Sequence, residues 1–179
     1  MNNIFCDGGY RSSTNIMAWA WVSEDGEEYN SYAEEGGTNQ VAELKAILDV
    51  LKHINKKPFT PSTKIHSDSA YCVNMLMGVY NKKTGNTTAP WYKNWQRNGY
   101  VNSKNEPVAN QEIIKEIVEL FEKLDVGLIK VRGHSNNEMN NLADKLDEKD
   151  SPTDKGFDTW KYLWDNRLYI SNTGGINYE

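Results

Sequence analysis

The chain has 179 residues, 38% hydrophobic and 25% charged, with both signs mixed along its length, which favours one folded domain and excludes a largely disordered chain. Its formal net charge of −5 argues against a uniformly basic nucleic-acid-binding protein, but not against a local basic surface. No apolar run is long enough to span a membrane, and the first residues lack a signal sequence. The two cysteines, Cys6 and Cys72, do not suggest a disulfide framework. We therefore expect a cytoplasmic protein that does not enter a membrane.

The first part of the chain predicts three strands. Residues 4–6 form a short apolar run that ends in an Asp-Gly-Gly turn signal at residues 7–9. Residues 17–22 alternate large and small side chains with a period of two, which is typical of a strand. Residues 28–33 return as a third strand after the Asp-Gly turn signal at 25–26. These three segments indicate an antiparallel meander.

The rest of the chain alternates between helices and strands. Apolar residues recur at three- and four-residue steps over residues 41–54, which predicts a helix that Thr38 or Asn39 caps. Asp68 or Ser69 is a candidate cap for a second helix, which continues to residue 77. The other predicted elements are a strand at 63–66, a loop at 79–90, a short helix at 91–97, a loop at 103–107, a helix at 113–124, a strand at 128–131, a loop at 133–137 and a helix at 138–148. This order predicts an α/β fold with a mixed five-stranded sheet and helices on both faces.

Four carboxylates stand near the predicted ends of strands and helices. Asp7 and Asp68 follow the first and fourth strands, and functional residues in open α/β sheets gather at the carboxyl ends of strands. Glu43 and Asp144, on the long helix and on the final helix, can reach the same edge. Spacing alone leaves simpler roles open: Asp7 as a turn former, Asp68 as a helix cap, and the other two as solvated charges on helices.

The local sequences around these carboxylates closely resemble type 1 ribonuclease H. The matching segments are FCDGG at 5–9, TNQVAEL at 38–44, HSDSAY at 66–71, VRGH at 131–134 and NLAD at 141–144. They occur in the family's order and with its separations, over roughly residues 4–146. The resemblance implies a ribonuclease H-like fold, with a catalytic domain over residues 1–150 and a C-terminal extension over residues 151–179 that packs on it.

The resemblance also implies an activity: endonucleolytic hydrolysis of the RNA strand of RNA–DNA hybrids. Asp7, Glu43, Asp68 and Asp144 match the family's metal-binding carboxylates, and His134 matches the loop histidine credited with proton transfer or product release. Hydrolysis needs an activated water and a stabilised leaving oxygen, which two divalent ions about 4 Å apart provide. We expect two Mg²⁺ ions, with Mn²⁺ as a substitute, because Mg²⁺ prefers oxygen ligands.

The hybrid must also be bound. Residues 91–100 interleave aromatic and basic side chains and resemble the family's basic protrusion, which contacts the DNA strand; the alternative is a small helix that packs its tryptophans into the core. The substrate-binding residues that the resemblance implies are Gly8, Asn15, Thr38, Asn39, Gln40, Trp91, Lys93, Trp95 and Arg97. The predicted local positive surface consists of Lys82, Lys83, Lys93, Arg97 and Lys104.

The sequence departs from the family at three places. The loop at residues 10–15 is shorter than usual, Ala70 stands where the family often has Gln, and residues 79–90 look like an insertion that either extends the substrate contact or only lengthens a loop. Two other functions stay open on the sequence: a DNA nuclease or resolvase of related fold, and a hybrid-binding protein without catalysis. We expect a monomer.

Overall fold

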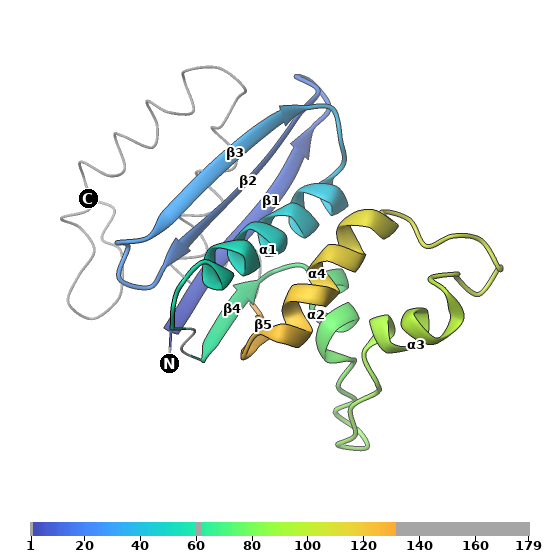
Figure 1. Cartoon of the computed structure of the whole chain (residues 1–179). Helices are drawn as coiled ribbons and strands as arrows, with labels where there is room; N and C mark the ends of the chain where they lie inside the picture. The colour runs from blue at the N-terminus through green and yellow to red at the C-terminus, as the bar shows by residue number, and fades with distance from the viewer. Residues whose placement is uncertain (1, 60–61, 132–179) are drawn as a thin grey trace.

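The computed structural model describes residues 2–59 and 62–131 (Figure 1). Its elements in chain order are β1 (Asn2–Arg11), β2 (Ile16–Ser23), β3 (Tyr29–Glu35), α1 (Asn39–Asn55), β4 (Thr63–Ser67), α2 (Ala70–Met77), α3 (Trp91–Asn98), α4 (Gln111–Lys123) and β5 (Val126–Lys130). The strands form one sheet in the order β3-β2-β1-β4-β5. β1, β2 and β3 pair antiparallel, whereas β4 pairs parallel with both β1 and β5. The predicted mixed five-stranded sheet is confirmed. The predicted helix at 138–148 and the loop before it lie outside the described residues.

The main hydrophobic core lies between one face of the sheet and α1. Alternate residues of the first two strands, among them Cys6, Trp19 and Trp21, belong to the same buried cluster as the apolar residues of α1. α1 buries residues at three- and four-residue steps, as its periodicity predicted. The predicted cap is confirmed at Thr38, whose hydroxyl accepts a hydrogen bond of 3.1 Å from the backbone N–H of Val41. This helix therefore fixes its own start at the edge where β1 ends.

α4 and α2 complete the described part of the core. α4 packs beside α1 and buries Ile114, Ile117 and Val118. α2 contributes Met75 and Leu76, both almost completely buried. Figure 1 shows these helices beside α1, with α3 and its flanking loops extending outward from them. No helix among the described residues is long and apolar enough to cross a membrane.

β1 is longer than the sequence predicted. The Asp-Gly-Gly segment at 7–9 is not a turn but the middle of the strand, and the turn lies at residues 12–15. The strand continues because residues 7–11 pair with residues 16–20 of β2. Gly8 has a different reason to be glycine: a Cβ there would lie 2.4 Å from the backbone carbonyl of Ala42 in α1.

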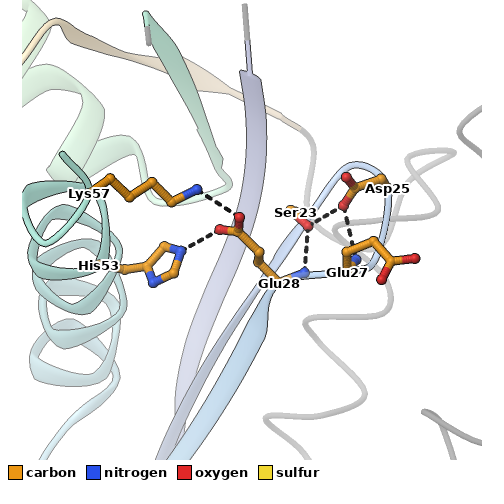
Figure 2. Close-up of polar contacts among 6 residues, drawn as sticks. All are labelled: Ser23, Asp25, Glu27, Glu28, His53 and Lys57. Carbon is orange, nitrogen blue, oxygen red and sulfur yellow. Dashed lines mark hydrogen bonds and ion pairs between the residues drawn. The ribbon is translucent and has the colours of Figure 1, made fainter. Parts of the chain in front are cut away.

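At the end of the sheet where β1 begins, a polar network ties the β2–β3 turn to the end of α1 (Figure 2). The carboxylate of Glu28 accepts a hydrogen bond of 2.7 Å from Lys57 Nζ, and it also pairs with His53 Nε2. The hydroxyl of Ser23 donates to Asp25 and accepts from the backbone N–H of Glu28. These contacts fix the turn against α1 and lie at the amino end of β1, away from Asp7.

Candidate active site

Asp7 and Asp68 lie at the same level of two neighbouring parallel strands. The parallel pairing of β1 with β4 ends at Phe5 and His66, and each aspartate follows its paired residue by two positions. Neighbouring strands are about 4.8 Å apart, so the two residues stand side by side, Asp68 just after the end of β4 and Asp7 within β1, past its pairing with β4. Asp7 is buried, with 8% of its surface exposed.

Two contacts bring the first turn of α1, and with it Glu43, against this edge. Gly8 lacks the side chain that would separate the backbones: a Cβ there would lie 2.7 Å from the backbone nitrogen of Glu43. Two residues further along β1, the backbone N–H of Tyr10 donates a hydrogen bond of 2.7 Å to the side-chain oxygen of Asn39. Helix α1 is therefore fixed to β1 at its start, and Glu43 stands beside the strand that carries Asp7.

Glu43 and Asp68 are close enough to interact electrostatically. Burial raises the pKa of Glu43, and the negative charge of Asp68 raises it further, while a hydrogen bond from the Ser69 side chain acts in the opposite direction. Beneath them lie Cys6 and Cys72, both buried and not disulfide-bonded. Burial raises the pKa of the Cys72 thiol to about 12, with the charges of Glu43 and Asp68 among the further causes. The site is therefore an acidic pair above an apolar floor.

Ser69 is a residue of this site that the sequence did not single out for it. The hydroxyl of Ser69 accepts a hydrogen bond of 3.2 Å from the backbone N–H of Cys72, so Ser69 and not Asp68 caps α2. The backbone N–H of Ser69 in turn donates to the hydroxyl of Ser67. This cap fixes the chain immediately after Asp68. The serine was visible in the sequence as a cap candidate, but nothing in the sequence connected it to Glu43.

The chemistry of this donor set fits a divalent cation with oxygen ligands. Carboxylates that crowd one another are stabilised by a bound cation, and Mg²⁺ is bound through a few carboxylates, waters and substrate phosphates. Within residues 2–59 and 62–131, no group of three or more His, Cys, Asp or Glu side chains converges closely enough to hold an ion. Asp144 and His134, the other two residues that the sequence predicts for this site, lie outside the described residues.

The predicted substrate-binding residues at the start of α1 also have structural roles. Thr38 and Asn39 are exposed, but the first caps the helix and the second accepts the hydrogen bond from β1. Gln40 is half-buried in the first turn. Asn15 lies in the β1–β2 turn in the left-handed conformation, at φ 53°, where the Tyr10 hydroxyl donates to its side-chain oxygen over 2.6 Å. All four residues lie near the carboxyl end of β1.

α3 divides its predicted binding residues between two surfaces. Lys93 and Arg97 are exposed, whereas Trp91 and Trp95 are half-buried. The ring of Trp91 packs edge-on against Tyr71 at 5.6 Å between centroids, and it also contacts Trp95. The residue of this helix that enters the core is Tyr92, which is 4% exposed. The helix thus presents cations to the surface while its aromatic side chains anchor it.

A mixed five-stranded sheet, with Glu43 and Asp68 from separate segments close together beside it, defines an α/β protein with an acidic site. The family model described as RNase H matches residues 1–151. The chain therefore belongs to the ribonuclease H family, whose members generally depend on divalent metal ions.

Two relatives and two solved structures illustrate the relationship. The chain is 35% identical over 145 residues to the Ribonuclease H of Syntrophomonas wolfei, covering 80% of this chain and 90% of that protein. It is also 35% identical over 148 residues to the Ribonuclease H of Clostridium botulinum strain Hall, with 80% and 90% covered. The fold matches the foamy viral protease-reverse transcriptase solved with dsDNA (TM-score 0.65, 24% identity, 80% of this chain and 89% of that chain). The same viral protein solved with an RNA/DNA hybrid gives a TM-score of 0.62 at 21% identity, covering 80% of this chain and 19% of that chain.

Proposed function

We propose that this protein is a ribonuclease H that hydrolyses the RNA strand of RNA–DNA hybrids endonucleolytically. The observation that carries the proposal is the acidic pair of Glu43 and Asp68, which come from different segments and lie close enough to interact electrostatically in a chain of the ribonuclease H family. The relatives named above carry the name Ribonuclease H. One of the structures with the same fold was solved with an RNA/DNA hybrid.

The proposed cofactor is a pair of Mg²⁺ ions, which Mn²⁺ can replace. Asp7, Glu43, Asp68 and Asp144 are their proposed ligands. Bound there, the ions supply an activated water and stabilise the charge on the leaving oxygen. The protein's own contribution is position: the β1–α1 contact holds Glu43 beside the strand that carries Asp7, and the Ser69 cap fixes the chain just after Asp68. A neighbouring cation favours the charged form of Glu43, whose pKa is raised mainly by burial.

The proposed path of the hybrid runs from this edge toward α3. Lys93 and Arg97 are exposed there and contact phosphates, which position a duplex without reading its sequence. Thr38 and Asn39, at the start of the helix that carries Glu43, contact the strand to be cut. Gly8 allows the close approach of the backbones of β1 and α1.

Several further assignments belong to the same proposal. His134 assists proton transfer or product release, because a histidine titrates near neutral pH. Residues 1–150 form the catalytic domain, and residues 151–179 form an extension that packs on it. The protein acts as a monomer in the cytoplasm, a location supported by two buried cysteines that are not disulfide-bonded.

The deciding experiment is cleavage of an RNA–DNA hybrid labelled on its RNA strand, in Mg²⁺, in Mn²⁺ and in EDTA. We expect cutting of the RNA strand with either metal and none in EDTA. Single-stranded RNA, double-stranded RNA and DNA duplexes of the same sequence are the controls. Cutting of DNA alone would make the protein a related DNA nuclease. Tight hybrid binding without cutting in either metal would make it a binding protein.

A further inference from the structure

One segment of the chain carries basic residues and no acidic ones. Residues 69–105 contain five Lys or Arg residues and no Asp or Glu. Because the whole chain has a formal net charge of −5, the residues outside this segment carry −10. Such a separation of charge creates a local positive field that the total conceals.

The cations of this segment differ from those of α1 in their surroundings. In α1 and just after it, Lys45, Lys52 and Lys57 each form an ion pair with a glutamate. The five cations of the basic segment are all exposed, and none of the ion pairs found among the described residues involves them. They are Lys82, Lys83, Lys93, Arg97 and Lys104. These side chains are available to an anionic partner.

Two of the five stand on a hairpin of their own, residues 78–88, between α2 and α3. Backbone hydrogen bonds close it: Thr88 N–H to the carbonyl of Val79 at 2.9 Å, and Asn81 N–H to the carbonyl of Asn86 at 2.8 Å. The side chain of Asn81 further accepts from the backbone N–H of Lys83 at 2.9 Å. The hairpin is therefore a built element with a defined tip, and in Figure 1 it projects below α2, away from the sheet.

The base of the hairpin requires glycine. Gly78 has a φ of 84°, and a Cβ there would lie 2.0 Å from the carbonyl oxygen of Thr88. The close approach of these two backbones sets the direction in which the hairpin leaves α2. Residues 79–89 are all exposed, including Tyr80 at 61%. None of the apolar side chains of residues 79–89 is buried, so packing into the core does not explain the defined structure of the hairpin.

We propose that this hairpin is a phosphate-binding arm, in which Lys82 and Lys83 contact the sugar-phosphate backbone of a nucleic-acid duplex beyond the surface of α3. The inference rests on the proposed function, since the duplex is the RNA–DNA hybrid bound at the carboxylates. Helix α2 connects the two sites: it starts just after Asp68 and ends at the hairpin. The eight residues of α2 span about 12 Å at 1.5 Å per residue. This length corresponds to the spacing of three to four phosphates along one strand, at about 3.4 Å per phosphate.

The test compares Lys82→Ser/Lys83→Ser with a control of equal charge loss, Lys56→Ser/Lys123→Ser, in the full chain. The control lysines are exposed and lie at the C-terminal ends of α1 and α4. Binding of a fluorescent RNA–DNA hybrid is measured in EDTA at several KCl concentrations. The salt slope of the binding constant should fall by about 1.8 for two lost phosphate contacts. From 50 to 200 mM KCl, wild-type affinity should then fall about 12-fold more than that of the arm variant.

A second variant tests the geometry without changing the charge. Gly78→Ala cannot keep the present hairpin base, so it should weaken hybrid binding in the same direction while both lysines remain. A salt slope unchanged in the arm variant, or changed equally in the control pair, would overturn the inference. So would an effect on single-stranded RNA with none on the hybrid. Cleavage in Mg²⁺ is measured separately: its absence would contradict the proposed function, whatever the binding slopes show.

Discussion

The backbone of Gly8 in β1 lies directly against the backbone of Ala42 in α1, where a Cβ on the glycine would be 2.4 Å from both the carbonyl carbon and the carbonyl oxygen. Neither atom belongs to a flexible side chain, so an added methyl group must move α1 away from β1. We expect Gly8→Ala to lower the free energy of unfolding by about 2–3 kcal/mol. Because Glu43 moves with the helix, hybrid cleavage should fall as well. Denaturant unfolding and the cleavage assay measure the two effects.

Gly127 of β5 provides the matched control. A Cβ there would meet only the end of the flexible Lys64 side chain, at 2.9 Å, and no strained φ is involved. Gly127→Ala should therefore change the free energy of unfolding by less than about 0.5 kcal/mol. Equal losses in the two variants would mean that the helix–strand contact does not decide the cost.

The Gly8 contact also shows which part of the fold could not be predicted from the sequence. The periodicity of α1 and the alternation of β2 predicted those elements because each buries one face, and burial of one face imposes a repeating pattern. The Asp-Gly-Gly segment at 7–9 was wrongly predicted as a turn. Glycine there serves the approach of a helix 34 residues away in sequence, between Gly8 and Ala42. Such a tertiary contact leaves no local signal.

The candidate site likewise combines residues that the sequence predicted with contacts that it could not predict. Motif order and spacing pointed to Asp7, Glu43 and Asp68, and their roles as metal ligands stay predictions. Ser69 acquires its relation to Glu43 only when α1 and α2 pack together. In α3, the sequence showed an interleaving of aromatic and basic residues but not that Tyr92 is the one that enters the core. One short helix of eight residues has too few turns to show which face is buried.

Asp49 offers a test of a half-buried charge. The indole N–H of Trp19 donates to its carboxylate, yet burial raises the pKa of Asp49 above its ordinary value. A raised pKa in the folded state means that stability falls as the pH rises from about 3.9 through the folded value. Asp49→Asn keeps an acceptor for Trp19 without the charge, so it should be more stable than wild type at pH 7. Denaturant unfolding should show this advantage shrinking toward pH 4; a less stable variant at pH 7 would contradict it.

Glu28, at the end of the sheet where β1 begins, predicts a pH dependence of stability opposite to that of Asp49. A hydrogen bond from Lys57 is the main cause that lowers its pKa, and His53 adds to it (Figure 2). A lowered pKa contributes stability above the unfolded value that is lost as the pH falls through the folded value. Because the side chain of Glu28 is 39% exposed, Glu28→Gln should cost only about 0.5–1 kcal/mol at pH 7. The cost should vanish at acidic pH. Glu27→Gln, on the exposed neighbour, is the control and should change little at either pH.

The two surfaces of α3 should separate binding from stability. Lys93→Ser/Arg97→Ser should raise KM for the hybrid and reduce the salt slope by about 1.8, with unfolding unchanged, because both side chains are exposed. Tyr92→Ala should instead lower the free energy of unfolding by about 3 kcal/mol, since its ring is buried against Phe121. Kinetics at several salt concentrations and denaturant unfolding measure both. Unchanged kinetics in the double variant would remove α3 from the substrate contact.

Substitution of the site carboxylates should lower activity, and at Glu43 it should also raise stability in the absence of metal. Asp7→Asn and Glu43→Gln should each reduce hybrid cleavage in Mg²⁺ by at least about a thousandfold, equivalent to about 4 kcal/mol of transition-state stabilisation. EDTA should abolish wild-type cleavage, and added Mg²⁺ should restore it. In EDTA, however, Glu43→Gln should be more stable than wild type, because it removes a carboxylate that burial and Asp68 disfavour in its charged form. Asp125→Asn, at an exposed carboxylate, should alter neither property. An active Asp7→Asn or Glu43→Gln enzyme would exclude that residue as a ligand, whereas an inactive Glu43→Gln enzyme that is also unstable in EDTA would show that Glu43 acts through the fold.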